Sequence, residues 1–394
     1  MNFVSPAAER PPFLFIVGIL LIATTLRVAF TGAAPLLDAI RGEYGLTTAQ
    51  TGLLTTLPLL AFGLVSPLAA GIARRFGMER SLLLAMILIC LGIGLRSLPS
   101  VALLFFGTAI IGCGIALGNV LLPGLIKRDF ARHIARMTGA YSLTMGAAAA
   151  LGSAMVVPLA LTGMGWHGAL LMLMVFPLLA LFVWLPQSRR QVPATLTGSG
   201  AMHSRGIWRS ALAWQVTLFL GINSLVYYII IGWLPAILQS IGYSETQAGS
   251  LHGLLQLATA APGLVIPLLL HRLQDQRGIA VLTALMCAAS SLALWFFPAQ
   301  AAVWAIIFGF GSGATMILGL TFIGLRASSA HQAAALSGMA QTVGYLLAAC
   351  GPPIMGKIHD ANGDWHIPLI AVAMMSVMMA VSGALAGRNR EIHG

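Results

Sequence analysis

The chain of 394 residues is 58% hydrophobic and only 8% charged, with 21 basic and 10 acidic residues and a formal net charge of +11. Soluble globular proteins carry about 25% charged residues. A soluble core cannot hide this much apolar surface, so the composition excludes a soluble protein and makes the lipid bilayer the solvent. The positive charge would suggest nucleic-acid binding in a soluble protein, but in a membrane protein its placement along the chain matters more.

Twelve apolar segments predict twelve transmembrane helices and therefore an all-α membrane protein. They cover residues 13–40, 50–72, 81–98, 101–126, 137–160, 167–186, 212–238, 246–270, 279–297, 301–325, 333–357 and 367–387. Residues 187–210 contain proline, glycine, serine and four arginines, which is typical of a linker. We expect this linker to be cytoplasmic and to join an N-terminal six-helix bundle, residues 1–186, to a C-terminal one, residues 211–394.

The basic residues predict the orientation in the membrane. If the N-terminus is cytoplasmic, 17 of the 21 basic residues lie inside, Arg41, Arg96 and Lys357 lie in outer loops, and Arg27 lies within a span. Cytoplasmic loops carry such an excess of lysine and arginine. We therefore expect a multi-pass protein of the bacterial inner membrane with both termini cytoplasmic, whose loop charges contact anionic lipid rather than nucleic acid.

An internal repeat divides the chain at its midpoint. GLTTAQTG at 45–52 matches GYSETQAG at 242–249, and IIGCGIALG at 110–118 matches IFGFGSGAT at 307–315, both at an offset of 197. MTGAYS at 137–142 matches LSGMAQ at 336–341. The repeat predicts two pseudo-symmetric bundles with a substrate site between them near the bilayer midplane. Glycines four residues apart in the second matching pair are expected to let helices approach closely.

The twelve spans, the duplication, the basic linker and a basic loop after the second span resemble the major facilitator superfamily. The loop ARRFGMER at 73–80 keeps Arg75 and Gly77 of the superfamily pattern Gly-x-x-x-Asp-Arg-x-Gly-Arg, but Arg74 replaces the aspartate. The finer resemblance is to the branch of cyanate and 2-nitroimidazole transporters, above all the 2-nitroimidazole exporters. It is carried by TTLRVAFTGAAPLLD (24–38), GIALGNVLLPGLIKRDF (114–130), TGAYSLTMG (138–146) and GLRASSAHQAAALSGMAQTVGYLL (324–347).

This resemblance implies a secondary transporter that exports 2-nitroimidazole-type compounds, and hence drug resistance by efflux. Uptake of a small anion such as cyanate is the alternative within the same branch. The resemblance assigns no residue to the substrate, so the candidate site residues come from the chain itself.

Arg27 is the most informative of these residues. It follows Phe13 by 14 residues, about 21 Å along a helix, and therefore lies well inside the membrane. A charge there is costly and usually faces a polar cavity. Helical spacing places Thr24, Arg27 and Thr31 on one face. The guanidinium, a planar fork of donors, is predicted to hold an anion or a nitro group, and the alternative is a structural arginine that bonds backbone carbonyls.

The seventh and eighth spans supply the other main candidates. Alignment on Pro35 and Pro235 makes Tyr227 the counterpart of Arg27 in the second half. We expect Tyr227, with Asn223 and Tyr228, to face Arg27 across the central cavity. Tyrosine offers a flat apolar face with a hydroxyl, which suits a small aromatic ring, but interhelical packing is an equal alternative. The eighth span carries a polar stripe at helical spacing, formed by His252, Gln256 and Thr259. His252 is a candidate for substrate binding or proton transfer, or else a hydrogen-bonded structural histidine.

Weaker candidates are single polar residues in otherwise apolar helices, which more often bond helices together than bind ligands. They are Asn119, Tyr141, Ser142, Gln341 and Tyr345. All ten acidic residues lie at span ends or in loops. Asp38, near the outer end of the first span, comes closest to the membrane and joins His252 as a candidate for proton coupling.

Other classes of function receive little support from the sequence. A membrane enzyme needs a catalytic pair or a metal cluster, and no such spacing is visible. A passive channel differs from a carrier only in behaviour, which counterflow of labelled substrate tests. The four cysteines lie within spans without metal or disulfide spacing. We expect no cofactor, no metal ion and a monomer.

Overall fold

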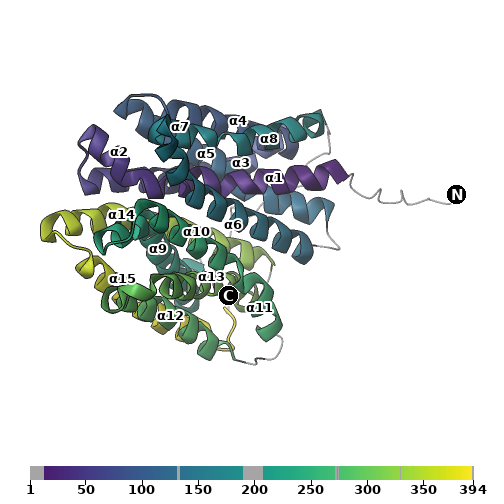
Figure 1. Ribbon diagram of the computed structural model, residues 1–394. Helices are drawn as coiled ribbons and strands as arrows, with labels where there is room; N and C mark the ends of the chain where they lie inside the picture. The colour runs from purple at the N-terminus through teal and green to yellow at the C-terminus, as the bar shows by residue number, and fades with distance from the viewer. Residues whose placement is uncertain are drawn as a thin grey trace.

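The computed structural model describes residues 13–130, 134–189, 207–270, 273, 275–328 and 330–392, and the regular elements in these residues are all helical. The helices form two groups stacked one above the other (Figure 1). The first group comprises α1 (Phe13–Thr31), α2 (Leu37–Tyr44), α3 (Thr48–Phe76), α4 (Met78–Arg96), α5 (Val101–Asp129), α6 (Ile134–Leu159), α7 (Gly165–Met172) and α8 (Val175–Trp184). The second comprises α9 (Ala211–Ser240), α10 (Glu245–Ala260), α11 (Pro262–Leu270), α12 (Arg277–Phe296), α13 (Ala301–Arg326), α14 (Ala330–Asn362) and α15 (His366–Ala386).

The predicted spans all fall on helices. The described residues contain ten helical stretches long and apolar enough to cross a membrane, of which Gly139–Ser188 holds both the fifth and the sixth predicted spans. The eleventh predicted span lies within α14. Three spans are broken into pieces: the first between α1 and α2, the sixth between α7 and α8, and the eighth between α10 and α11. The all-α membrane fold is therefore confirmed.

The repeated octapeptide is a repeated helix start. In both copies a glycine with positive φ, Gly45 at 62° and Gly242 at 102°, precedes the helix. Thr47 then caps α3 and Ser244 caps α10, and each forms a reciprocal capping box with a glutamine three residues later. A capping box satisfies backbone donors that the first helical turn leaves unpaired. The octapeptide therefore begins the second predicted span of each half in the same way.

Glycines in the fourth and tenth predicted spans let helices approach closely, as the sequence predicts. A Cβ on Gly114 in α5 would lie 2.7 Å from the Ala85 carbonyl oxygen. A Cβ on Gly313 in α13 would lie 2.2 Å from the carbonyl oxygen of Thr259 in α10. Real Cβ atoms do not come this close, so only glycine permits these crossings. The second crossing also fixes the backbone of Thr259, which becomes important at the site.

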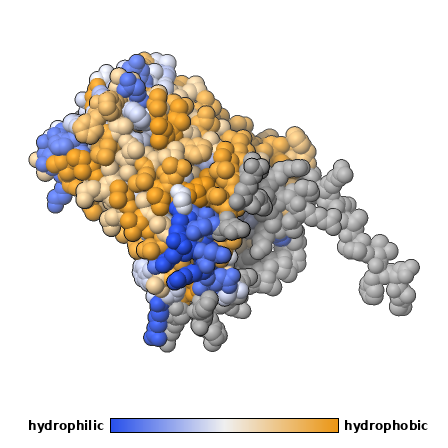
Figure 2. Space-filling view, turned by 90° about the horizontal axis from the view of Figure 1, so that it is seen from below, coloured by the Kyte–Doolittle hydropathy of each residue, from blue (hydrophilic) through white to orange (hydrophobic). Residues whose placement is uncertain are grey.

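Each half has its own buried core. The largest cluster of buried apolar side chains runs from Ile207 to Ile392, and two further clusters lie within residues 15–184. Of the predicted linker at 187–210, only residues 187–189 and 207–210 are described, and the remainder lies outside the described residues. The face seen in Figure 2 is largely apolar, with hydrophilic residues gathered toward two ends. Large apolar side chains such as Phe182, which is 77% exposed, suit contact with lipid.

The halves meet through α3 against α14 and α6 against α10. These pairs touch backbone to backbone at the end of the molecule that carries α2, which we name the closed end. A Cβ on Gly253 would lie 2.6 Å from the Ala150 carbonyl oxygen, and a Cβ on Gly356 would lie 2.9 Å from the Thr48 carbonyl oxygen. At the opposite end, which we name the linker end, Gly139 and Gly338 have open space where a Cβ would be. The halves are therefore packed together at the closed end, and the two linker-end glycines make no comparable close contact.

Two arginines hold the ends of α5 and α13 at the linker end. Arg128 pairs with Glu79 at 2.5 Å and with Asp129 at 2.8 Å. Burial alone would lower the pKa of Arg128, but hydrogen bonds to Asp129 and Glu79 and their charges outweigh burial and raise it above its ordinary value. In the second half, Arg326 bonds the carbonyl oxygen of Ala386 at 2.9 Å and Oε1 of Gln276 at 2.6 Å. Arg74 replaces the aspartate of the superfamily loop, and Glu79, five residues later in the sequence, forms an ion pair with Arg128.

The closed-end packing predicts a contrast between two Gly→Ala substitutions. Gly253→Ala and Gly139→Ala both raise helix propensity, which stabilises each protein by about 1 kcal/mol. Gly253→Ala also forces its methyl group against the Ala150 carbonyl oxygen, and such overpacking costs about 1–3 kcal/mol. We expect the purified Gly253→Ala protein to melt a few degrees below the Gly139→Ala protein in the same detergent. Equal melting temperatures would show that the closed end is not tightly packed.

Candidate functional site

Arg27 in α1 reaches from the first half of the molecule to the second. The residue is half-buried, and its Nη1 donates a hydrogen bond to Thr259 Oγ1 in α10 at 3.2 Å. Its Nη2 donates to the hydroxyl of Tyr227 in α9. The guanidinium carbon also lies 5.1 Å from the centre of the Tyr227 ring, within the range of a cation–π interaction. One side chain therefore joins three helices across the interface.

The partners of Arg27 are themselves oriented by Gln256. The Tyr227 hydroxyl donates to Gln256 Oε1 at 3.0 Å, and the Thr259 hydroxyl donates to the Gln256 carbonyl oxygen at 2.7 Å. Because each hydroxyl has one proton to donate, both turn their lone pairs toward the guanidinium. The amide nitrogen of Gln256 is buried and has no hydrogen-bond partner. The network thus leaves one unused donor beside the arginine.

The charge of Arg27 is not balanced by an acid. Among the described residues, no carboxylate forms an ion pair with it, and its side-chain partners are two neutral hydroxyls. An arginine stays protonated in proteins. The site therefore keeps a positive charge inside the membrane, where the low dielectric constant strengthens its attraction for a negatively charged or strongly polar group.

Four aromatic rings form a continuous group beside this network, which we name the aromatic cluster: Phe30, Phe62, Tyr228 and Tyr345. Phe30 meets Tyr228 edge-on at 5.8 Å between ring centres, and Phe62 lies 4.1 Å from Tyr345. Tyr228 lies 6.4 Å from Tyr345 and 5.1 Å from Tyr227. Phe30 and Phe62 belong to the first half, and Tyr228 and Tyr345 belong to the second. The aromatic cluster therefore crosses the same interface as Arg27.

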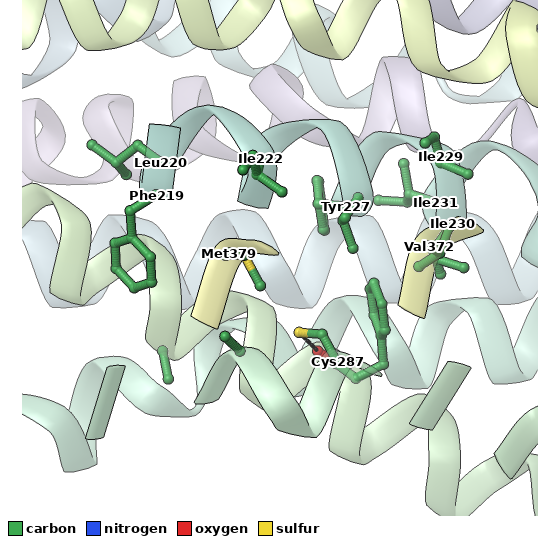
Figure 3. Close-up of a cluster of buried hydrophobic side chains, with 14 of the residues drawn as sticks. Phe219, Leu220, Ile222, Tyr227, Ile229, Ile230, Ile231, Cys287, Val372 and Met379 are labelled. Atoms are coloured by element: carbon green, nitrogen blue, oxygen red, sulfur yellow. Dashed lines mark hydrogen bonds between the residues drawn. The ribbon is translucent and has the colours of Figure 1, made fainter. Parts of the chain in front are cut away.

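The ring of Tyr227 packs among apolar side chains, whereas its hydroxyl bonds polar groups. Figure 3 shows it among buried side chains that include Ile222 and Ile230 on the same helix. Aliphatic packing on this side restricts the ring, while the hydroxyl bonds Arg27 and Gln256. A buried tyrosine needs such a partner for its hydroxyl.

Other predicted site residues lie apart from the Arg27 network. Asn223 Oδ1 accepts a hydrogen bond from Ser312 Oγ at 3.1 Å, which ties α9 to α13. His252 is fully buried, and its Nε2 lies 2.8 Å from the Ile231 carbonyl oxygen. Since a carbonyl only accepts, Nε2 carries the proton and Nδ1, which has no partner, is the free acceptor.

The remaining candidates bond locally or lie near the cluster. Thr24 and Thr31 donate to the carbonyl oxygens of Leu21 and Arg27 in their own helix. Asp38 on α2 lies 3.9 Å from Arg41 in a half-exposed ion pair, away from Arg27. Asn119, Tyr141 and Ser142 are half-buried in α5 and α6, and Gln341 is exposed in α14. Of these weaker candidates, only Tyr345 joins the aromatic cluster.

Phe30 and Phe62 were not predicted as site residues. In a membrane helix a phenylalanine ordinarily faces lipid or packs against other helices. Nothing in the sequence around Phe30 or Phe62 distinguishes these ordinary roles from a place in the site. A polar signal existed for Arg27, Tyr227 and Gln256, but none exists for these rings. The described residues contain no group of three or more histidine, cysteine or acidic side chains placed to hold a metal ion.

The chain is similar to known proteins over almost its whole length. The family model of the Major Facilitator Superfamily matches residues 19–352. A 2-nitroimidazole transporter of Escherichia coli (strain K12) is 77% identical over 377 residues, which is 96% of each chain. The cyanate transport protein CynX of the same organism is 27% identical over 91% of this chain and 94% of that protein.

Solved structures of low sequence identity share the fold. The nucleoside transporter NupG has a TM-score of 0.78 at 13% identity, with 95% of this chain and 100% of that chain covered. The xylose transporter XylE from E. coli has a TM-score of 0.72 at 14% identity, with 94% and 95% covered.

The network predicts different costs for removing two adjacent hydroxyls. Tyr227→Phe leaves the buried Oε1 of Gln256 without its donor and Arg27 without an acceptor, which costs about 1–3 kcal/mol. Tyr228→Phe is the matched control, because the Tyr228 hydroxyl has no hydrogen bond among the described residues. We expect a lower melting temperature in detergent for Tyr227→Phe only, and equal values would argue against the network.

Proposed function

Because this chain belongs to the Major Facilitator Superfamily, we propose that it is a secondary transporter that exports 2-nitroimidazole-type compounds by alternating access. The observation that carries the proposal is Arg27, an unbalanced positive charge that lies beside a cluster of aromatic rings. A relative that is 77% identical to this chain is a 2-nitroimidazole transporter. Outward transport, and hence a role in drug resistance, is part of the proposal.

The chemistry of the site suits this substrate. A nitro group is planar and presents two oxygens, which match the fork of the Arg27 guanidinium. A small flat ring fits against tyrosine faces, which offer apolar area together with polar edges. Tyr227, Tyr228 and Tyr345 would enclose the ring, and the unused amide donor of Gln256 would contact a polar atom of the solute.

Binding at Arg27 would also affect the contact between the halves. The guanidinium bonds Thr259 and Tyr227 of the second half. A substrate that accepts hydrogen bonds from the same donors would compete with these contacts and weaken one link across the interface. Rocking of the halves about a central site requires such links to be exchanged rather than permanent.

A small anion such as cyanate is the second candidate substrate, taken up rather than exported. The unbalanced charge of Arg27 favours it, since a monoanion would neutralise that charge fully. The aromatic cluster favours the nitroimidazole, because a three-atom anion uses little of its area. Both candidates would occupy the same site, so competition between them decides the matter.

We further propose that the protein is a monomer in the bacterial inner membrane with both termini cytoplasmic, so that the linker end faces the cytoplasm. The excess of basic residues in the predicted inner loops supports this orientation. His252 and Asp38 are the proposed coupling residues if transport depends on protons. His252 offers a buried free acceptor at Nδ1, and Asp38 is a half-exposed acid at the closed end.

The deciding measurement is counterflow in proteoliposomes loaded with unlabelled 2-nitroimidazole. We expect transient accumulation of labelled 2-nitroimidazole, because a carrier exchanges through one mobile site whereas a channel does not. Unlabelled cyanate is the competitor, and a pH gradient tests coupling. Saturable cyanate uptake against which 2-nitroimidazole does not compete would replace the proposal by the second candidate. Passive equilibration without counterflow would indicate a channel.

Substitution of Arg27 tests the assignment of the site. Loss of a charged hydrogen bond costs about 1.5–3 kcal/mol, so Arg27→Ala should lower kcat/KM about 10- to 150-fold. Arg27→Lys keeps the charge without the planar fork and should retain an intermediate rate. Arg277→Ala, which removes an exposed arginine paired with Asp275, is the control and should transport normally. Unchanged counterflow by Arg27→Ala at equal reconstitution would refute the assignment.

A further inference from the structure

A second buried arginine lies in the first half, outside the network of Arg27. Arg96 is the last residue of α4, and the sequence places it in an outer loop. The structure instead turns its side chain into the bundle, where the residue is only 2% exposed. The burial of this charge therefore needs its own explanation.

One of the Arg96 donors has a structural use. Its Nη1 donates to the Ala29 carbonyl oxygen in α1 at 2.7 Å. The helix α1 ends at Thr31, and the Ala33 amide bonds the Phe30 carbonyl oxygen instead of that of Ala29. Arg96 therefore supplies the donor that the helix end leaves missing, as basic side chains commonly do at such ends.

The other donors of Arg96 have no such use. Its Nε and Nη2 are buried and have no hydrogen-bond partner. Buried donors in proteins nearly always have a partner in the protein, in ordered water or in a bound ion. The guanidinium cannot lose its proton to escape the cost of burial, so a charge and two donors remain to be satisfied.

Arg96 also lines a cavity. Its volume is about 20 Å³, and its lining includes Arg96, Phe30, Pro58, Ile111 and the hydroxyl residues Thr55 and Thr108. A cavity needs about 10–15 Å³ to hold a water molecule, so this one accepts a monatomic ion or a single water and excludes a nitroimidazole. None of its lining residues is acidic.

We propose that this cavity binds a small inorganic monovalent anion of the size of chloride, held by Nε and Nη2 of Arg96. The anion would neutralise the buried charge that no lining carboxylate balances. The Thr55 and Thr108 hydroxyls donate to the carbonyl oxygens of Gly52 and Leu104, both at 2.7 Å, and would turn from these carbonyls to donate to the anion. All lining residues belong to the first half, so the ion stays with that half when the halves move. It would brace α1 two residues after Arg27 and is not the transported solute.

The test measures stability against halide concentration. The purified full chain in detergent is titrated with sodium chloride or bromide at constant ionic strength, with gluconate, which is too large for the cavity, as the replaced anion. Ligand binding to the folded state raises stability with concentration. We expect a saturable rise of a few degrees in melting temperature with either halide. A melting temperature that does not depend on halide would show that the cavity holds only water.

Variants then locate the effect. Arg96→Gln can still donate to Ala29 but lacks the charge, and it should lose the halide dependence. Thr108→Val keeps the shape of the cavity and should raise several-fold the halide concentration that gives half of the rise in melting temperature. This variant keeps the test decisive if the Arg96→Gln protein is unstable. Arg326→Gln is the control, since Nε and Nη2 of Arg326 already bond protein acceptors, and its halide dependence should persist. Halide dependence retained in both Arg96→Gln and Thr108→Val would overturn the site.

Direct observation completes the test. A crystal grown in bromide should show an anomalous peak within hydrogen-bond distance of Arg96 Nη2, and the absence of that peak would count against the anion. This result is independent of 2-nitroimidazole transport, so either proposal can fail without the other.

Discussion

The structure depends on one constraint: a positive charge in the middle of the first membrane helix is satisfied by neutral groups of the opposite half. Arg27 bonds Tyr227 and Thr259 rather than a carboxylate. Neutral acceptors leave the charge unbalanced, and in a low-dielectric interior such a charge attracts whatever negative or polar group can reach it. The same contacts join the halves, so the unbalanced charge and one link between the halves belong to the same side chain.

Arg326, Arg27 and Arg96 differ in the partners that their donors find. Arg326 donates hydrogen bonds to carbonyl oxygens at a helix end and to Gln276. These protein acceptors account for its burial without a ligand. Arg27 donates to two neutral hydroxyls of the other half. Arg96 has one carbonyl partner and two vacant donors, and it lines a cavity. Burial alone is therefore a poor guide to function in this fold, because what matters is how many donors remain unused.

The duplicated sequence builds an asymmetric molecule. Capping boxes at Thr47 and Ser244 begin matching helices in both halves, and glycines such as Gly114 and Gly313 set matching crossings. The functional groups do not repeat: Arg27 lies in the first copy, and Tyr227 and Gln256 lie in the second. The interface between the halves therefore presents different side chains from its two sides.

The sequence by itself determined the helical elements and pointed to Arg27 as the centre of the candidate site. Apolar length defined the spans, the glycine pattern defined the close crossings, and the rarity of charge inside a membrane identified Arg27. Only the tertiary structure decided that Asn223 turns to Ser312, that Phe30 and Phe62 join the tyrosines, and that Arg96 lies inside the bundle. Hydropathy and spacing are local properties of the chain. The partner of a side chain depends on how helices distant in sequence rotate and pack, and a long side chain at a helix end can turn inward or outward.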